Sequence, residues 1–408
     1  METLLNIILF ALLDLVTVRG IKRTFPQFAF RHQQEIRRIL IIQVSVMVTI
    51  LFGGTLIARR ISDYRLIAGY YYLFGFLFAL YVPKLVYAVF LMIDWGVSTI
   101  IVKSLRKPRH LLAKNGLWIS TIFIFVVLWG MFFERYRFTV EHVEISFEHL
   151  PDAFDGYKIV QVSDIHVGSS AGTVQRFKKA VELINAQEPD LFVFTGDMVN
   201  NFANETTPLI PLFSQTNARD GKFAILGNHD YGGYFNWNNS ADSVANQKAL
   251  ETAIRQMGFV LLKNQSVTIR RCTDSIALIG TENWGISKKH PKQGDLVKAM
   301  DSAQHIPFKL LLSHDPSFWT QWVKGKTDIA LTLAGHTHGM QMGLKLGKQH
   351  YNPLYLLRFR YLTGLYRTDK QYLYVNRGLG VIVFPGRIGM SPEITVITLR
   401  KEKLPVQP

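Results

Sequence analysis

The chain has 408 residues, of which 48% are hydrophobic, and its formal net charge is +16. Its length allows more than one domain. The single cysteine, Cys272, excludes an internal disulfide. Residues 1–135 contain 16 Lys/Arg against 6 Asp/Glu, placed between long apolar runs. This arrangement is typical of the cytoplasmic loops of membrane proteins and disfavours nucleic acid as the main partner.

Four apolar runs in residues 1–135 predict four membrane spans. The second, with about 20 residues and no charge, is long enough for a helix that crosses a ~30 Å hydrocarbon core, and the first is shorter. The runs are residues 3–18 with Asp14, Ile39–Ala58, Leu66–Ile93 with Pro83 and Lys84, and Leu117–Phe133. The third run allows an alternative of two short spans, if Leu85–Val102 counts separately. A buried core helix is the other alternative for each run, and the length of the runs argues against it.

The basic residues between these runs predict the orientation. Two stretches hold most of them, Arg19–Arg38 between spans one and two, and Lys103–Lys114 between spans three and four. Because basic loops stay in the cytoplasm, four spans place everything after Phe133 outside it. Three or five spans would reverse this prediction.

From Glu134 onward the pattern changes to that of an α/β domain. Phe138–Phe147 alternates as a half-exposed strand does, and Thr173–Ala186 and Ser243–Met257 have helical spacing. Val260–Leu262 and Val267–Ile269 suggest a hairpin, and further strands are expected at Ser275–Gly280, Tyr372–Val375 and Ile394–Leu399. So many strands with few helices predict two packed sheets flanked by helices, preceded by an all-α transmembrane region.

Five more apolar runs each end in a short polar cluster. The strands are Lys158–Val162, Leu191–Thr195, Phe223–Leu226, Phe308–Leu312 and Ile329–Ala334. The clusters that follow are Asp164-Ile165-His166, Gly196-Asp197, Gly227-Asn228-His229-Asp230, Ser313-His314-Asp315 and Gly335-His336-Thr337-His338. Because the carboxyl ends of strands in an open α/β sheet face one crevice, the clusters predict a single metal site.

The residue types in these clusters suit a site for two metal ions. Asp, Asn and His ligands fit Mn, Fe or Zn and select poorly among them. A lone carboxylate between two cations can bridge them, and Asp197 is the natural candidate. Such a pair of ions activates water and neutralises phosphoryl charge. A purely structural use of each cluster is the alternative, and their conjunction in one domain argues against it.

In order along the chain, the clusters resemble the motif set of the calcineurin-like metallophosphoesterases, in particular the branch with membrane spans before the phosphoesterase domain. The resemblance covers about residues 136–400 and implies a sandwich of two sheets flanked by helices. It implies one metal on Asp164, His166 and His338, a second on Asn228, His314 and His336, and Asp197 as the bridge. It also implies that His229 stabilises or protonates the leaving oxygen, with Asp230 fixing its ring. Met340 departs from the pattern, because this branch often has a second glycine there.

Three residues are candidate substrate contacts. Tyr231 opens an aromatic loop that either lines a pocket or packs inward. Arg377 and Arg387 flank a glycine-rich stretch, where guanidinium groups either contact a phosphate or form surface salt bridges. The stretch Leu354–Tyr366 either packs on its own domain or lies on the membrane.

Together these features predict an integral membrane protein with a helical anchor at 1–135 and a catalytic domain at 136–408. The expected activity is hydrolysis of a phosphoester or phosphoanhydride bond through a metal-activated hydroxide, with a phospholipid or lipid-linked phosphate as an attractive substrate. Monoester, diester and pyrophosphate substrates all stay open. The alternative is a non-catalytic membrane receptor or scaffold on the same fold, and the complete set of candidate ligands argues against it.

Overall fold

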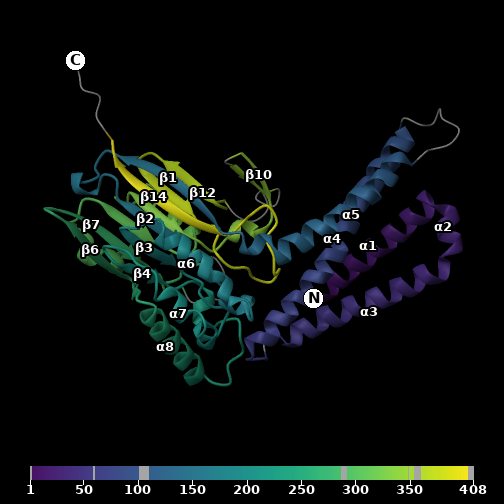
Figure 1. The fold of residues 1–408 in the computed structure, drawn as a ribbon, viewed down its shortest axis with the longest axis horizontal. Helices are drawn as coiled ribbons and strands as arrows, with labels where there is room; N and C mark the ends of the chain where they lie inside the picture. Colours follow the sequence, from purple (N-terminus) through teal and green to yellow (C-terminus); the bar gives the residue numbers. More distant parts are fainter. Residues whose placement is uncertain are drawn as a thin grey trace, which may run out of the picture. The chain divides into compact units, whose positions relative to one another are not determined.

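The computed structural model describes residues 2–57, 60–100, 110–285, 292–347, 349–352 and 360–402. The chain forms two compact units (Figure 1). The first consists of Met1–Ile61 and Gly69–Phe132, and the second of Ser62–Ala68 and Phe133–Pro408.

The first unit is helical. Its helices are α1 (Glu2–Thr24), α2 (Pro26–Arg31), α3 (Gln33–Ile57), α4 (Tyr64–Ile100) and α5 (Leu111–Phe132). Four of them, all but the short α2, are long and apolar enough to cross a membrane. The prediction of four spans is therefore confirmed by length and composition. The third run forms one continuous helix through Pro83, and Val102 of the alternative short span lies outside the described residues.

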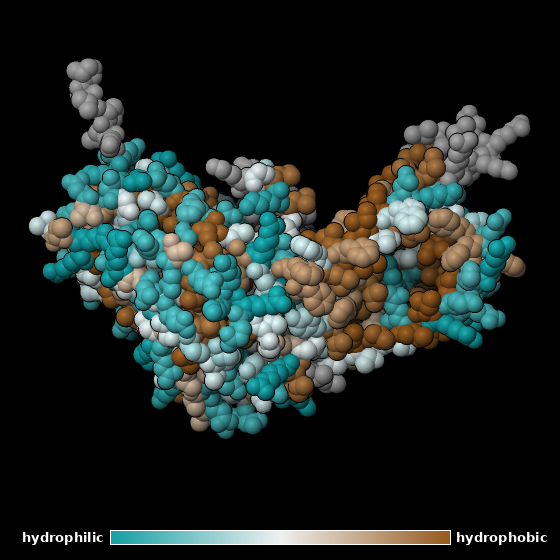
Figure 2. Space-filling model, viewed as in Figure 1, coloured by the Kyte–Doolittle hydropathy of each residue, from teal (hydrophilic) through white to brown (hydrophobic). Residues whose placement is uncertain are grey.

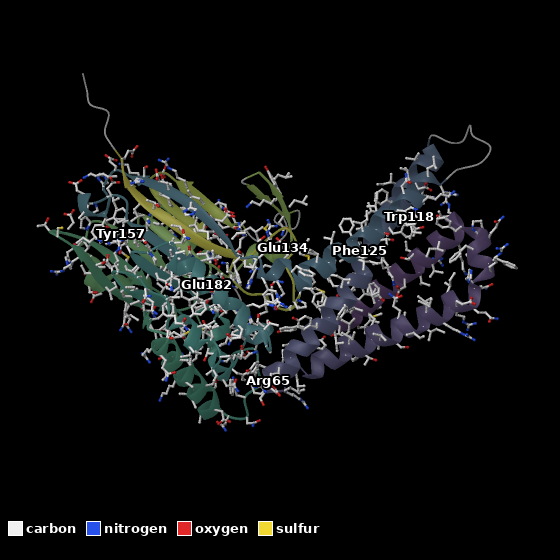
Figure 3. The ribbon with its side chains drawn as sticks, viewed as in Figure 1. Arg65, Trp118, Phe125, Glu134, Tyr157 and Glu182 are labelled. Atoms are coloured by element: carbon white, nitrogen blue, oxygen red, sulfur yellow. The ribbon has the colours of Figure 1, made fainter. Side chains whose placement is uncertain are left out.

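Much of the helical surface that is visible in Figure 2 is apolar and coloured brown. On α5, Trp118 and Phe125 (Figure 3) leave 75% and 67% of their surface exposed. Side chains of this kind are stable when they face lipid, and this exposure explains why the helices need a bilayer.

Three charged residues of the spanning helices, Asp14, Lys84 and Asp94, are paired. Lys84 on α4 forms an ion pair with the buried Asp14 of α1, and the Tyr81 hydroxyl donates to the other Asp14 oxygen at 2.8 Å. Asp94 lies 2.9 Å from His110 Nδ1. Pairing lowers the large cost of placing a charge in hydrocarbon, so these groups stabilise helix packing.

The second unit contains two six-stranded sheets. The first has the order β1-β14-β2-β3-β4-β5, and the second β12-β13-β9-β8-β7-β6. The first sheet consists of β1 (Thr139–Phe147), β2 (Lys158–Val162), β3 (Leu191–Thr195), β4 (Lys222–Ile225), β5 (Val260–Leu261) and β14 (Glu393–Lys401). The second consists of β6 (Gln265–Arg271), β7 (Asp274–Gly280), β8 (Lys309–Leu312), β9 (Leu331–Ala334), β12 (Gly364–Thr368) and β13 (Gln371–Val375).

The two sheets pack face to face with helices on their outer faces, as expected for a sandwich. Alternation along β3 directs Leu191 and Val193 into the layer between the sheets, and Phe192 and Phe194 toward the helices. The helices are α6 (Lys178–Asn185), α7 (Ile210–Phe213), α8 (Ser240–Gln256) and α9 (Leu296–Met300). Because both faces are covered, the central strands are mostly apolar.

Some local predictions were wrong. The expected hairpin of Val260–Leu262 and Val267–Ile269 does not form, because β5 pairs with β4 of the first sheet and β6 with β7 of the second. Only the second part of Thr173–Ala186 is α-helical, after a 3-10 turn at Val174–Phe177. The strand β12 and a separate hairpin of β10 (Leu344–Leu346) and β11 (Gln349–Tyr351) were not predicted.

Leu354–Tyr366 was predicted either to pack on its own domain or to lie on the membrane, and the structure describes only its second part. Residues 353–359 lie outside the described part of the chain. At the other end of the stretch, Tyr361 and Leu362 are buried, and Tyr361 packs edge-on against Trp319 at 5.4 Å. This end therefore packs on its own domain.

Candidate metal centre

The five predicted clusters converge at the carboxyl ends of β2, β3, β4, β8 and β9. Donor atoms lie within 4.8 Å of one another in three overlapping groups. These groups are Asp164, His166 and His338; His166, Asp197 and His229; and Asp197, His314 and His336. Since neighbouring groups share His166 and Asp197, they form one continuous cluster.

Local backbone geometry aims these side chains at a common point. Asp164, His166, Asp197, His336 and His338 all have positive φ values, between 43° and 73°. This conformation is uncommon for residues other than glycine, and such strain concentrates at functional sites. The positive φ gives the backbone a sharp turn after the strand. This turn directs the side chain back over the end of the sheet.

Asp197 lies at the centre of the cluster. Its Oδ2 is 3.4 Å from His166 Nε2 and 3.1 Å from His314 Nε2, and its Oδ1 accepts the His229 backbone N–H at 2.8 Å. Gly227 makes this approach possible, because a Cβ there would lie 2.2 Å from Asp197 Oδ1. The carboxylate thus faces both sides of the cluster.

The remaining candidate ligands lie on either side of Asp197. On one side, Asp164 Oδ1 is 3.3 Å from His338 Nε2. On the other, His314 Nε2 lies 3.1 Å from Asn228 Oδ1 and 3.2 Å from His336 Nδ1. The structure therefore brings all seven predicted ligands together.

Two of the candidate histidine ligands, His166 and His314, are held through Nδ1 in the way that metal ligands require. His166 Nδ1 lies 3.1 Å from Asn200 Oδ1, and His314 Nδ1 lies 2.8 Å from the Thr195 carbonyl. These contacts leave Nε2 of each ring facing the cluster. His166 is fully buried, yet among the described residues its Nε2 has no hydrogen-bond partner. A buried nitrogen in this position fits a divalent cation.

The electrostatics of the cluster favour a cation as well. Burial alone would raise the pKa of Asp197, but the neighbouring His314 and His229 hold it well below its usual value. Burial lowers the pKa of His314, but the combined effect of Asp197, Asp164 and the Thr195 carbonyl raises it to about 10. Two buried carboxylates thus create the negative field that stabilises positive charge here.

His229 stands at the edge of this cluster. Its Nδ1 lies 2.9 Å from the Asn200 carbonyl, and its ring stacks on Tyr234 with a centroid distance of 4.1 Å. The prediction that Asp230 fixes this ring is therefore wrong. The Asp230 carboxylate instead accepts backbone N–H groups of Asp197, Met198 and Gly227 at 2.8, 2.8 and 2.9 Å. It holds together the two loops that follow β3 and β4.

Asp230 performs this role in an unusual environment. Burial, together with the charge of Asp197, raises its pKa to about 7. The backbone N–H groups act in the opposite direction, because they stabilise the carboxylate form. The position of this carboxylate supports the backbone of the site and leaves the orientation of His229 to Asn200.

The three predicted substrate contacts are buried and bonded within the domain. Tyr231 is buried, and its hydroxyl lies 3.3 Å from Glu282 Oε1. Arg387 is completely buried and donates to backbone carbonyls, including Gly380 at 2.6 Å. Arg377 pairs with Glu141 at 3.0 Å. All three side chains therefore bond to groups of their own domain.

The aromatic loop after Tyr231 packs partly inward, and one of its residues lies beside the candidate ligands. Phe235 and Trp237 pack edge-on with a centroid distance of 5.1 Å, as an inward-packing loop does. Tyr234 instead lies beside the site, 39% exposed, where its hydroxyl accepts the Asn228 side-chain N–H at 2.8 Å. Tyr234 therefore replaces Tyr231 as the aromatic residue next to the candidate ligands.

Sequence analysis missed Asn200 and Glu205. The Glu205 carboxylate accepts the backbone N–H groups of Gly168, Asn200 and Asn201 at 3.1, 2.6 and 3.0 Å. It thereby fixes Asn200, which orients both His166 and His229. The short spacing from Asp197 to Asn200 was a usable signal, whereas Glu205 resembled any surface glutamate in a loop.

Met340, which departs from the resembled pattern, adopts a φ of 59°. It lies between Gly339 and Gln341, whose φ values of 56° and 57° are also positive. The backbone thus keeps a conformation that glycine favours, and the methionine adds bulk without changing the turn.

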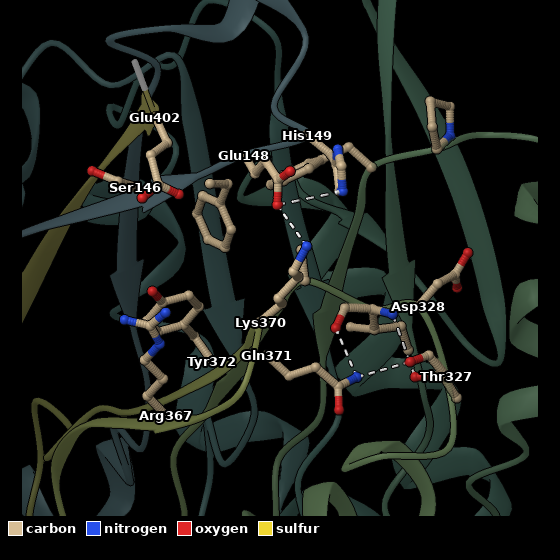
Figure 4. Close-up of a pocket in the computed structure, with 15 residues that line it drawn as sticks. Ser146, Glu148, His149, Thr327, Asp328, Arg367, Lys370, Gln371, Tyr372 and Glu402 are labelled. Atoms are coloured by element: carbon tan, nitrogen blue, oxygen red, sulfur yellow. Dashed lines mark hydrogen bonds and ion pairs between the residues drawn. The ribbon is translucent and has the colours of Figure 1, made fainter. Parts of the chain in front are cut away.

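A cavity lies at the end of the sheets opposite the metal cluster (Figure 4). Its volume is about 330 Å³, and its lining includes Phe147, Phe308, Arg367, Lys370 and Tyr372. Phe308 and Ala330 in this lining precede β8 and β9, whereas the metal cluster follows these strands. Lys370 there pairs with Glu148 at 2.5 Å. The cavity is thus separate from the candidate centre.

Comparisons with known proteins agree with this geometry. Residues 157–340 match a family model described as calcineurin-like phosphoesterase, and residues 1–135 one described as probable calcineurin-like phosphoesterase, transmembrane domain. The chain is 36% identical over 268 residues to the uncharacterized metallophosphoesterase YkuE of Bacillus subtilis, covering 64% of this chain and 85% of that protein.

Two further relatives are informative. The UDP-2,3-diacylglucosamine pyrophosphatase LpxG of Chlamydia trachomatis is 31% identical over 279 residues, 58% of this chain and 80% of that protein. A transmembrane protein with metallophosphoesterase domain from Danio rerio is 29% identical over 271 residues, 64% of this chain and 57% of that protein. The match thus spans little more than half of the Danio rerio protein.

Proposed function

The chain belongs to the calcineurin-like phosphoesterase family, and from this premise we propose that it hydrolyses its phosphorylated substrate at a centre of two metal ions. It is an integral membrane protein and an enzyme that acts on phosphoric esters, and the family uses divalent metals. Our proposal concerns the number of ions, the roles of individual residues, the substrate and the side of the membrane. We also propose that the anchor spans 1–135 and the catalytic domain 136–408.

The proposed ligands divide into two sets that share Asp197. Asp164, His166 and His338 would hold one ion, and Asn228, His314 and His336 the other. The observation that supports this division is the overlap of three donor groups through His166 and Asp197. Two bound ions, of Mn, Fe or Zn, would supply a water acidic enough to act near neutral pH and would neutralise phosphoryl charge.

His229 is proposed to act on the leaving oxygen. The Asn200 carbonyl can only accept a hydrogen bond, so His229 Nδ1 carries a hydrogen and Nε2 is the atom that exchanges a proton. Stacking on Tyr234 restricts the ring to one plane. Burial lowers the pKa of His229 to about 3, so Nε2 would donate to the departing oxygen after it takes up a proton together with the substrate.

The proposed substrate is a lipid-linked phosphate, with a phosphoanhydride preferred. Two observations support this class. The domain follows four candidate spans and is thus tethered at a bilayer. A relative of which four fifths is matched is named a pyrophosphatase of UDP-2,3-diacylglucosamine, a substrate with two acyl chains.

The test uses the full chain in phospholipid nanodiscs, stripped of metal and reloaded with Mn. Hydrolysis of a chromogenic phosphomonoester, a chromogenic phosphodiester and a UDP-linked diacylated sugar would be followed in parallel. We expect turnover only after metal is restored, and the highest kcat/KM for the lipid-linked diphosphate. A preference for a soluble ester would contradict the substrate class alone. Binding without turnover of any of the three would favour the receptor alternative.

We further propose that the catalytic domain lies outside the cytoplasm, because the two basic loop regions belong inside. Cys272, the single cysteine, is exposed and lies between β6 and β7. A membrane-impermeant maleimide is therefore expected to label intact cells that express the chain. Cys272→Ser is the matched control and should abolish labelling. Labelling that requires broken cells would place the domain in the cytoplasm.

A further inference from the structure

The hairpin of β10 and β11 forms a separate two-stranded sheet beside the two large ones (Figure 1). Its register pairs Leu344 with Tyr351 and Leu346 with Gln349, so one face carries Leu344, Leu346 and Tyr351. Leu344 and Leu346 are each 63% exposed, and Tyr351 is 48% exposed. An isolated two-stranded hairpin is marginal in water and normally requires a surface to pack on.

A further exposed apolar residue, Val383, lies in a loop that is bonded to the base of this hairpin. Val383 is 50% exposed and has a φ of 61°, which is strained for a β-branched side chain. Gln341 Nε2 donates to the Phe384 carbonyl at 2.8 Å, and the Gly343 N–H donates to Ile388 at 2.8 Å. The loop and the hairpin are therefore held together.

Both elements are bonded to the segment that follows helix α5. Arg135 Nη1 donates to the Pro385 carbonyl at 2.8 Å, and the Ser391 hydroxyl contacts Glu134. Lys345 of the hairpin pairs with Glu141 at 3.2 Å. Since α5 ends at Phe132, the hairpin and the Val383 loop are attached to the part of the domain closest in sequence to the bilayer.

We propose that Leu344, Leu346, Tyr351 and Val383 form a surface that docks onto the lipid interface of the membrane in which the chain is anchored. Leucine and valine gain by leaving water, and tyrosine is enriched at the boundary between acyl chains and headgroups. Lys345, which projects from the opposite face of the hairpin, remains in water with its partner Glu141. This docking surface is independent of the proposed chemistry.

Docking of the hairpin would also determine how close the metal cluster lies to the lipid headgroups. The hairpin follows directly on the Gly335–Gln341 segment, which contributes His336 and His338 to the cluster. The Asn352 side-chain N–H, at the end of the hairpin, donates to the Met342 carbonyl at 2.6 Å. A hairpin bound to lipid therefore holds this edge of the metal cluster close to the headgroup layer.

The test places a single environment-sensitive fluorophore on the hairpin of the full chain. Leu346→Cys in a Cys272→Ser background would be labelled with a nitrobenzoxadiazole dye and reconstituted in nanodiscs of phosphatidylcholine and phosphatidylglycerol. We expect a blue-shifted emission, strong quenching by lipids with a nitroxide near the headgroup, and protection from aqueous iodide. An amphipathic element at the interface lies about 5–10 Å into the headgroup boundary, so a shallow nitroxide is the right probe.

Val297→Cys in the same background is the matched control. Val297 is 78% exposed on α9. This helix packs on β6 and β7, and β6 forms the edge of the second sheet opposite β12. Its label should be quenched by iodide and insensitive to nitroxide lipid.

Two results would overturn the proposal. A hairpin label that behaves like the Val297 control would show that the surface faces water. A label protected from iodide but insensitive to nitroxide lipid would show that protein covers it, from this chain or from a second copy. Val383→Cys provides the same measurement if Leu346→Cys does not fold, which circular dichroism of the purified chain would reveal.

Discussion

Replacing Asp197 by asparagine is expected to lower kcat about a thousandfold or more and to reduce the metal content of the purified chain. The substitution keeps the size of the side chain and an oxygen that accepts the His229 N–H. It removes the negative charge and the second oxygen that could bind metal, which faces His166 and His314. Loss of about 4 kcal/mol of transition-state stabilisation corresponds to a factor of about a thousand.

The measurement combines elemental analysis of bound metal with kcat for a chromogenic ester after reloading with Mn. Asp152→Asn is the matched control, because its side chain is 83% exposed and pairs only with Lys401 among the contacts of the described chain. This control should keep both metal and activity. Full metal occupancy with unchanged kcat in the Asp197→Asn protein would disprove the bridging role.

Replacing His229 by glutamine is expected to lower kcat by about 10²–10⁴ while bound metal stays unchanged. The ring lies beside the cluster with its Nδ1 held by Asn200, so its loss should remove proton transfer and leave the other ligands in place. The effect should depend on the leaving group. An alkyl ester, whose oxygen needs a proton to depart, should lose more activity than a nitrophenyl ester.

This dependence on leaving group separates a chemical role from a structural one. A protein damaged by the substitution would lose activity equally on both esters. His305→Gln, which changes an exposed histidine of the same domain, serves as the control and should leave both rates unchanged. Equal losses on both esters, or a loss of metal, would show that His229 supports the site without transferring a proton.

Asn200 and Glu205 connect these two predictions. Asn200 contacts His166 through its side chain and His229 through its carbonyl, so one residue orients a candidate ligand and the candidate proton donor. Glu205 holds the backbone of Asn200 from within the protein. The geometry of the candidate centre thus depends on a buried carboxylate outside the set of candidate ligands.

The amino-acid sequence alone was sufficient to predict the spans, the sandwich and the convergence of the five clusters. The spans follow from length and from the scarcity of charges, both of which are local properties of the chain. Likewise, an apolar strand that is buried on both faces is recognisable without its neighbours, and parallel strands such as β2, β3 and β4 must present their carboxyl ends at the same edge.

Only the tertiary structure decided which partner each group takes. Asp230 is adjacent to His229 in sequence, yet it bonds to the backbone after β3, while the more distant Asn200 holds the ring. In the same way β5 and β6 are neighbours along the chain but pair in different sheets. A hydrogen bond depends on distance and direction to about an ångström, and long-range packing sets both. The sequence by itself therefore determined which residues reach the site, and folding determined which of them touch.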